Sequence, residues 1–490
     1  MDDRKFLIQK VASIASRVAM LGSGIGSIIY LTHKLGVAAY GEYASLIAIA
    51  MMIRFPAESF FHAALPFMAA EKQPEFLGSA ILRALAISGL VLGAISLLIG
   101  IVAPEFLRLE SPNLWFAACC EIFFGTVASG YMGVLIGRNH FLAYSLIFSS
   151  YWIARVLISV TLVELGFGTL GALTAIPIAS ILQFSLCAAA DRCHTLLSSR
   201  VSWKELWDKC KIYSVSMILE RMLYSCDLVA MKLFHANPLA VGYYATGLSL
   251  SQAFQTIARA LYPVQLQMLV YYRSAGQLSK FDSLAQSMIL ENMRIIGLAI
   301  LGLPFLPIVI NMLLGKDISN THAVFALIIA ASSFQLIFAT GRIFNVASGD
   351  LTQMRFLLFL ALILQSLGFG IAANLGGPPD DASEELGIFQ AICCAVVSIA
   401  SNLAQALFAV NLGLRSSKQP FPWVASLRVL GLASLLAFLG IFSLKLGLSA
   451  FLMLPLCVIA YGGLLILSGD LPIPDSLLPR RKNQDESPQP

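Results

Sequence analysis

About fourteen apolar runs of roughly 20 residues each make up most of this chain, and each run is long enough to cross a bilayer as a helix. The hydrophobic fraction is 58% and the charged fraction 12%, whereas soluble domains carry about 25% charged residues. The runs are 11–31, 43–70, 78–103, 114–136, 141–163, 170–190, 212–234, 243–271, 288–314, 323–346, 356–375, 386–412, 427–444 and 448–467. The sequence therefore predicts an all-α polytopic membrane protein with about fourteen transmembrane helices.

Basic residues are unevenly distributed between alternate loops. If the N-terminus is cytoplasmic, the cytoplasmic segments hold 19 of the 32 Lys and Arg residues. The outer loops then hold five, which are Lys34, Arg108, Lys232, Lys316 and Lys445. Because cytoplasmic loops are enriched in Lys and Arg, we predict that both termini are cytoplasmic and that the number of spans is even.

Motifs for metals, nucleotides and cofactors are missing from the sequence. Most of the nine cysteines lie inside apolar runs, and no Cys/His spacing is typical of a metal site. The glycine-rich segment 22–27 lies inside an apolar run without a preceding strand, so it does not fit a phosphate-binding loop. No Walker A sequence is present. We expect no metal, no cofactor and no nucleic-acid partner.

The chain contains an internal repeat with an offset of 201 residues. Ala39-Tyr-Gly-Glu-Tyr-Ala-Ser45 follows the first run, and Ala240-Val-Gly-Tyr-Tyr-Ala-Thr246 follows the seventh. Six spans per unit make the repeats parallel, with a substrate site expected in a central cavity at their interface. The predicted parts are an N-terminal six-helix lobe (1–195), a cytoplasmic linker (196–210), a C-terminal six-helix lobe (211–413), an additional helix pair (414–468) and a cytoplasmic tail (469–490).

These loop motifs resemble a known family. Lys34-Leu-Gly-Val-Ala-Ala-Tyr-Gly-Glu-Tyr-Ala-Ser45 is similar to the outer loop after the first helix of polysaccharide flippases of the MOP (multidrug/oligosaccharidyl-lipid/polysaccharide) exporter superfamily. The segments Asn237-Pro-Leu-Ala-Val-Gly-Tyr-Tyr-Ala-Thr246 and Leu313-Leu-Gly-Lys-Asp317 fit the same pattern. The resemblance implies two lobes around a cavity that opens alternately to each side. It also implies a lipid-diphosphate-linked sugar as cargo, and a C-terminal helix pair similar to that of lipid II flippases, where the pair forms part of a groove for the polyprenyl tail.

Polar side chains form a stripe on two equivalent runs. They are Arg54, Glu58 and His62 in run 43–70, and Gln252, Gln255, Thr256 and Arg259 in run 243–271. Spacings of three and four residues place each set on one helical face. The offset of 201 aligns Arg54 with Gln255 and Glu58 with Arg259. The two stripes are therefore expected on opposite walls of one cavity.

Arginines within the apolar runs indicate an anionic cargo. A guanidinium group pairs with phosphate through two parallel N–H donors, and the resemblance implies that arginines of the first, second and eighth helices hold a diphosphate. The predicted substrate-binding residues are Arg17, Arg54, Arg259, Gln252 and Gln255. The alternative for Arg54 and Glu58 is an intrahelical ion pair without a ligand.

Acidic residues in the apolar runs are candidates for ion coupling. The predicted set is Glu58, His62, Glu121 and Asp227. A carboxylate in a partly dry cavity can carry a proton or bind sodium. Interhelical salt bridges, which would also involve Glu220, Arg221 or Arg155, are the structural alternative.

The function that we predict is the flipping of a polyprenyl-diphosphate-linked oligosaccharide across the bacterial inner membrane for polysaccharide biosynthesis. The expected partners are the lipid-linked oligosaccharide, the bilayer, and a polysaccharide polymerase with its export machinery. One alternative is a multidrug and toxin extrusion antiporter, although cationic drugs would favour a cavity rich in carboxylates. The other is a membrane enzyme of polysaccharide assembly, although no loop much exceeds about 20 residues.

Overall fold

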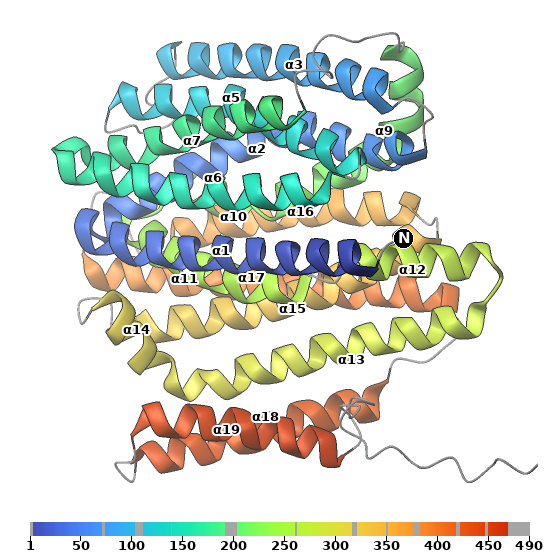
Figure 1. Cartoon of the computed structure of the whole chain (residues 1–490). Coiled ribbons are helices and arrows are strands. Elements are labelled where there is room, and N and C mark those ends of the chain that lie inside the picture. The colour runs from blue at the N-terminus through green and yellow to red at the C-terminus, as the bar shows by residue number, and fades with distance from the viewer. Residues whose placement is uncertain are drawn as a thin grey trace, which may run out of the picture. The chain divides into compact units, whose positions relative to one another are not determined.

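The computed structural model describes residues 3–70, 74–102, 111–138, 140–191, 203–259, 262–315, 321–348, 351–375, 383–417, 422–445 and 449–468. These residues are almost entirely helical (Figure 1). They divide into two compact units, one within Met1–Phe281 and Ile310–Lys418 and the other within Asp282–Val309 and Gln419–Pro490.

The first unit contains the helices of the N-terminal lobe and most of those of the C-terminal lobe. Those of the N-terminal lobe are α1 (Asp3–Leu35), α2 (Val37–Ala70), α3 (Pro74–Val102), α5 (Pro112–Gly137), α6 (Phe141–Leu162), a π-helical turn η1 (Val163–Phe167) and α7 (Gly168–Ala190). Those of the C-terminal lobe are α9 (Trp203–Leu223), α10 (Cys226–Leu233), α11 (Pro238–Arg259), α12 (Tyr262–Ser274), α15 (His322–Ser348), α16 (Leu351–Ala373) and α17 (Glu384–Ser417). The element α14 (Leu306–Leu314) crosses the boundary between the units.

The second unit, taken by itself, combines α13 (Leu278–Gly302) from Asp282 onward, the 3₁₀ turn η2 (Leu303–Phe305), α18 (Trp423–Lys445) and α19 (Ala450–Leu467). Helices α18 and α19 form an antiparallel pair (Figure 1). Tyr461 of α19 lies over Gly297 of α13, and its hydroxyl donates a hydrogen bond to the Arg294 carbonyl at 3.3 Å. A side chain at position 297 would occupy the place of the Tyr461 ring.

Every predicted span coincides with helix, and the all-α fold is confirmed. Two predicted spans are interrupted within the described residues. The span 212–234 breaks at Tyr224 and Ser225, and the span 288–314 contains η2 at Pro304. The span 243–271 is covered by α11 and α12 on the two sides of residues 260 and 261, which lie outside the described residues. Nine stretches of the described residues are long and apolar enough, by length and composition alone, to cross a membrane. The interrupted span 288–314 is among them within Leu278–Ile308, and the spans 141–163 and 170–190 are counted together as Leu142–Ala190, whereas the span 212–234 is not among them.

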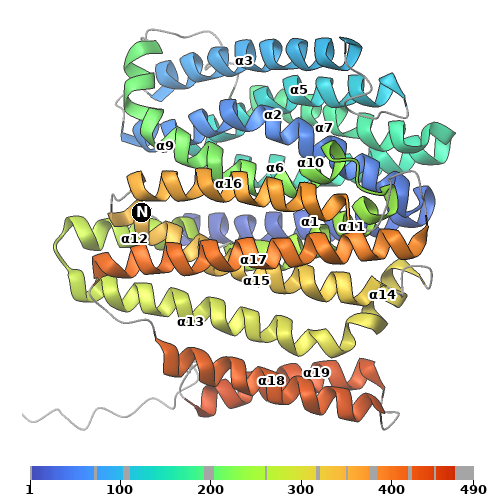
Figure 2. The ribbon, with the colours of Figure 1, turned by 180° about the vertical axis from the view of Figure 1, so that it is seen from behind.

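The two lobes pack their helices in the same order, as parallel repeats require. In the N-terminal lobe the first helix contacts the fifth (α1 and α6), and the fourth contacts the second and the sixth (α5 with α2 and α7). In the C-terminal lobe the same pairs are α9 with α16, and α15 with α11 and α17. Figure 2 shows α16 and α17 side by side from behind. The predicted repeat architecture is therefore present in the structure, whereas the predicted domain limits stay predictions.

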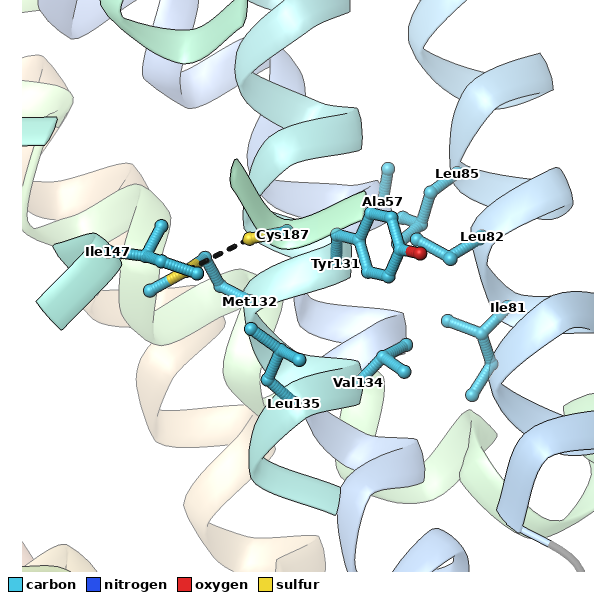
Figure 3. Close-up of a cluster of buried hydrophobic side chains, with 10 residues drawn as sticks. All are labelled: Ala57, Ile81, Leu82, Leu85, Tyr131, Met132, Val134, Leu135, Ile147 and Cys187. Atoms are coloured by element: carbon cyan, nitrogen blue, oxygen red, sulfur yellow. Dashed lines mark hydrogen bonds between the residues drawn. The ribbon is translucent and has the colours of Figure 1, made fainter. Parts of the chain in front are cut away.

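Each lobe has an apolar core of its own. In the N-terminal lobe α3, α5, α6 and α7 converge on Tyr131, Met132 and Ile81, which are buried (Figure 3). The thiol of Cys187 lies 3.4 Å from the Met132 sulfur within this core. In the C-terminal lobe Phe338 and Leu358 belong to the corresponding cluster. Because these side chains are buried and closely packed, they hold the helices that carry the polar residues in fixed positions.

The lobes meet along α2, which contacts α9, α10 and α11. Gly41 and Gly242 lie at a close approach of these helices. A Cβ atom built on Gly41 would lie 2.6 Å from the Gly242 nitrogen, and one built on Gly242 would lie 2.2 Å from the Val37 carbonyl oxygen. These distances leave no space for a methyl group without backbone movement. Glycine at both positions is required for this crossing of α2 and α11.

Candidate functional site

A cavity of about 350 Å³ lies between the two lobes. The N-terminal lobe lines it with residues of α1, α2 and α6, and the C-terminal lobe with residues of α10, of α11 and of the break between α9 and α10. Residues that carry polar or aromatic groups into this lining are Ser23, Ser27, Tyr40, Tyr43, Trp152, Arg155, Tyr224, Ser225, Ser249, Gln252 and Thr256. The helices around the cavity can be followed in Figure 1.

Arg155 of α6 is the charged residue among those that line the cavity in the described part of the chain. Its Nη2 donates a hydrogen bond to the Tyr43 hydroxyl of α2 at 2.8 Å, and its guanidinium lies 5.2 Å from the centre of the Trp152 ring. The described residues place no carboxylate within 4 Å of it. The cavity therefore has a positive charge whose direct contacts in the described residues are neutral, while the carboxylate of Glu121 acts on it electrostatically from a greater distance.

Arg54 is paired with two carboxylates. Its Nε lies 2.7 Å from the Glu58 carboxylate, and its Nη1 contacts the carboxylate of Glu121 on α5. Ser129 donates a hydrogen bond to Glu58 at 2.8 Å, and Ser180 of α7 donates one to Glu121 at 2.9 Å. The i, i+4 ion pair, which the sequence offers as the alternative to a cargo contact, is thus present in the structure, and Glu121 joins it from another helix. This cluster is not part of the cavity lining.

A second arginine reaches this cluster from the other lobe. Nη1 of Arg221, on α9, lies 3.6 Å from the second carboxylate oxygen of Glu58, and its guanidinium stands over the Phe55 ring at 5.6 Å. Along α2, Glu58 lies between the residues that line the cavity and the end of the helix at Ala70.

The lobes are also joined at the other end of the cavity. There the Tyr40 hydroxyl and Ser249 Oγ are 3.1 Å apart, and Lys232 of α10 lies 3.8 Å from Glu42. The same end holds the crossing of Gly41 with Gly242. The cavity therefore lies between two levels of contact between the lobes.

The remaining predicted cargo residues occupy different surroundings. Arg17 of α1 lies 5.3 Å from the centre of the Phe148 ring, one turn from cavity residues Met20 and Leu21. Gln252 lines the cavity, whereas the side chain of Gln255 is buried and donates a hydrogen bond to Gln335 of α15 at 2.7 Å. The predicted stripe on α11 is thus divided between the cavity and the interior of its lobe. The side chains of Arg259 and His62 lie outside the described residues.

Asp227 is buried near the start of α10. The backbone N–H of Leu228 donates to its Oδ1 at 2.8 Å, and the Tyr244 hydroxyl donates to its Oδ2 at 3.0 Å. No ion pair joins Asp227 to another described residue, unlike Glu58 and Glu121. Three or more potential metal ligands do not come together anywhere in the described ranges.

From the sequence, Arg155 is a candidate for interhelical salt bridges and not for the cavity. Its partner Tyr43 is 112 residues away and belongs to the loop motif rather than to either polar stripe. One signal was available, because an arginine near the middle of an apolar run needs a polar environment.

Comparison with known proteins gives matches in structure but not in sequence. No protein-family model matches the chain, and no curated protein does. A structure titled "Lipid II flippase MurJ, inward closed conformation" superposes with a TM-score of 0.67 at 15% identity, covering 94% of this chain and 99% of that one. This chain has the MOP fold.

Two transporters of the multidrug and toxin extrusion (MATE) type show the same fold over a shorter part of the chain. An inward-facing multidrug resistance MATE family transporter of the MOP superfamily gives a TM-score of 0.60 at 12% identity. The eukaryotic MATE transporter AtDTX14 gives 0.54 at 15%. Each covers 84% of this chain and 98% of its own. The prediction of a MOP fold is confirmed, and the polysaccharide-flippase subtype stays a prediction.

Proposed function

We propose that this protein flips a polyprenyl-diphosphate-linked oligosaccharide across the bacterial inner membrane by alternating access. The observation that carries the proposal is the placement of Arg155 in a cavity between the two lobes, without a carboxylate among the described lining residues. The most extensive structural match given above is to a lipid II flippase, which supports a lipid-linked cargo.

Arg155 is suited to a diphosphate by its chemistry and by its surroundings. A guanidinium has five N–H donors, and Tyr43 accepts from Nη2 while Trp152 packs near the guanidinium. Donors that point into the cavity can pair with phosphate oxygens in the bidentate geometry that arginine favours. Arg17, Arg54, Arg259 and Gln255 stay proposed cargo contacts, and Arg54 would have to leave Glu58 and Glu121 to take part.

The coverage of the chain also supports a flippase over a MATE transporter. The match to the lipid II flippase extends over 10% more of the chain than the MATE matches, or about 49 residues. The segment that carries α18 and α19 has about this length. A cationic drug would in addition bind better to a carboxylate than to Arg155. The enzyme alternative has no support among the structural matches, which are transporters.

For ion coupling we propose Asp227 before Glu58, His62 and Glu121. Glu58 and Glu121 are engaged by Arg54, whereas Asp227 receives hydrogen bonds from neutral groups only in the described residues. A buried carboxylate without a cation is the group that gains most from a proton or a sodium ion. We further propose cytoplasmic termini and cooperation with a polysaccharide polymerase and its export machinery.

The proposal is tested in cells that lack the gene, by measuring surface polysaccharide and the accumulation of lipid-linked precursor. The wild-type gene should restore export, and Arg155→Gln should reduce it by roughly 10- to 100-fold, since a charge-assisted hydrogen bond contributes about 1.5–3 kcal/mol. Arg155→Lys should retain part of the activity because the charge remains.

Arg83→Gln is the matched control, because Arg83 is exposed on α3 and does not line the cavity. Equal loss in both variants at equal expression would contradict the role of Arg155. Restored drug resistance in an efflux-deficient strain, without any effect on precursor accumulation, would favour the MATE alternative.

A further inference from the structure

The two walls of the cavity differ in chemistry. The wall of the N-terminal lobe carries the guanidinium of Arg155, with Tyr43 and Trp152 beside it. The wall formed by α11 carries Ser249, Gln252 and Thr256, which are all neutral. Their spacing of three and four residues places them on one face of the helix, along the length of the cavity.

Hydrogen bonding on the α11 wall leaves both donors and acceptors for a ligand. The Thr256 hydroxyl donates a hydrogen bond to the backbone carbonyl of Gln252 at 2.8 Å. The lone pairs of the Thr256 hydroxyl oxygen point away from that bond and can accept from a ligand. Ser249 shares a hydrogen bond with the Tyr40 hydroxyl at 3.1 Å. The side-chain amide of Gln252, exposed in the cavity, has no partner within the described residues. An amide offers two donors and a carbonyl acceptor at one position.

This combination of groups matches the hydroxyls of an uncharged sugar. A sugar hydroxyl both donates and accepts, so it can bond to an amide and a threonine oxygen at the same time. Aromatic residues of the lining, such as Tyr40 and Tyr224, add apolar area of the kind that encloses ligands in pockets. A second anionic group would face a wall without a cation, where an uncompensated charge is costly.

Resting on the proposed function, we infer that the cavity binds its cargo in two parts, with the diphosphate at Arg155 and the adjoining sugar, an uncharged hexose rather than a hexuronic acid, at Gln252 and Thr256. Gln252 is then the residue that determines specificity for the sugar. Arg155 determines affinity for every cargo of the same lipid class.

The test uses the full chain in lipid nanodiscs and three synthetic probes. They are a polyprenyl diphosphate, the same lipid carrying one hexose, and the same lipid carrying one hexuronic acid. Wild-type protein should bind the hexose probe roughly 3- to 10-fold more tightly than the other two, as one or two net hydrogen bonds allow. Gln252→Met and Thr256→Val should remove this preference, so that the hexose probe binds no more tightly than the bare lipid.

Two matched controls separate recognition from structure. Thr161→Val removes a threonine that makes the same bond to the carbonyl four residues earlier, on α6 and away from the cavity. Gln353→Met removes an exposed glutamine of α16. Both should keep the hexose preference. In the opposite direction, Gln252→Arg should make the hexuronic acid probe bind at least as tightly as the hexose probe.

Several outcomes would overturn the inference. One such outcome is that Gln252→Met weakens the binding of all three probes equally. Another is that the wild-type protein binds the hexuronic acid probe as tightly as the hexose probe. Either result would show that the α11 wall does not distinguish the sugar, while the proposed function stands. If wild-type protein binds none of the probes, the proposed function fails and this inference fails with it.

Discussion

Gly41 and Gly242 occupy the same position in the two repeats, 201 residues apart, and their backbones lie against each other where α2 crosses α11. Residues that are related by a twofold axis touch only where they lie close to that axis. The pseudo-twofold axis of the lobes therefore passes beside this glycine pair. This axis relates α2 to α11, and both helices line the cavity.

Alanine at either glycine should open the contact between the lobes. In Gly41→Ala or Gly242→Ala the new Cβ would meet backbone atoms, which cannot rotate away. We expect a loss of stability of about 1–3 kcal/mol, measured as a lower melting temperature in detergent, together with reduced export. Gly22→Ala is the control, since a Cβ atom there meets nothing within 4 Å. Wild-type stability in both lobe-contact variants would show that the crossing is not close in the membrane.

Removal of the Arg54 charge should destabilise the N-terminal lobe. Arg54→Gln leaves the buried carboxylates of Glu58 and Glu121 without their shared cation, and breaking a buried pair in this way costs about 3–5 kcal/mol. The triple variant Arg54→Gln, Glu58→Gln, Glu121→Gln should recover most of the melting temperature. If the triple variant also exports at the wild-type level, Arg54 is a structural residue and does not hold the diphosphate.

The contact of Arg221 with Glu58 should control access to the cavity from the end of α2 at Ala70. We expect Arg221→Gln to increase labelling of a cysteine placed at Met51, a cavity residue, by a maleimide supplied from that side in a cysteine-free background. Arg342→Gln, which breaks the pair with Glu220 inside one lobe, should leave labelling unchanged. Equal labelling in the wild type and in Arg221→Gln would contradict this role.

The membrane orientation can be tested with reporter fusions. Because Lys and Arg are concentrated in alternate loops, fusions after Gly376 and after Ser468 should report opposite sides, with Ser468 cytoplasmic. Both reporters on one side would contradict the parallel arrangement of the repeats.

The sequence is sufficient to predict the fold because its main determinants are local. Length and apolarity locate the helices, and the spacing of Arg54 and Glu58 allows the ion pair that the structure contains, which from the sequence is the alternative to a cargo contact at Arg54. The repeat identified Gly41 and Gly242 as equivalent positions. That these two residues touch could not be read from the repeat, because the offset gives correspondence and not distance.

The site was less predictable because its contacts join distant parts of the chain. Glu121 stands 67 residues from Arg54, and Tyr43 stands 112 residues from Arg155. Gln252 and Gln255 are only three residues apart, yet one faces the cavity and the other bonds to Gln335. The rotation of each helix about its axis determines whether a polar residue faces a ligand or another polar residue. A run of uniformly apolar neighbours does not define that rotation.

Because the cavity lies between two lobes, its two walls are synthesised one after the other. At synthesis rates of about 5–20 residues per second, the 201 residues that separate α2 from its counterpart α11 require roughly 10–40 s. Arg155 precedes Ser249 of the opposite wall by 94 residues, so for roughly 5–20 s of that interval it has Tyr43 beside it but no opposite wall. The nascent N-terminal lobe thus presents a charged face inside the bilayer until its second half arrives, and a chain that stops before α9 should be a substrate for membrane quality-control proteases.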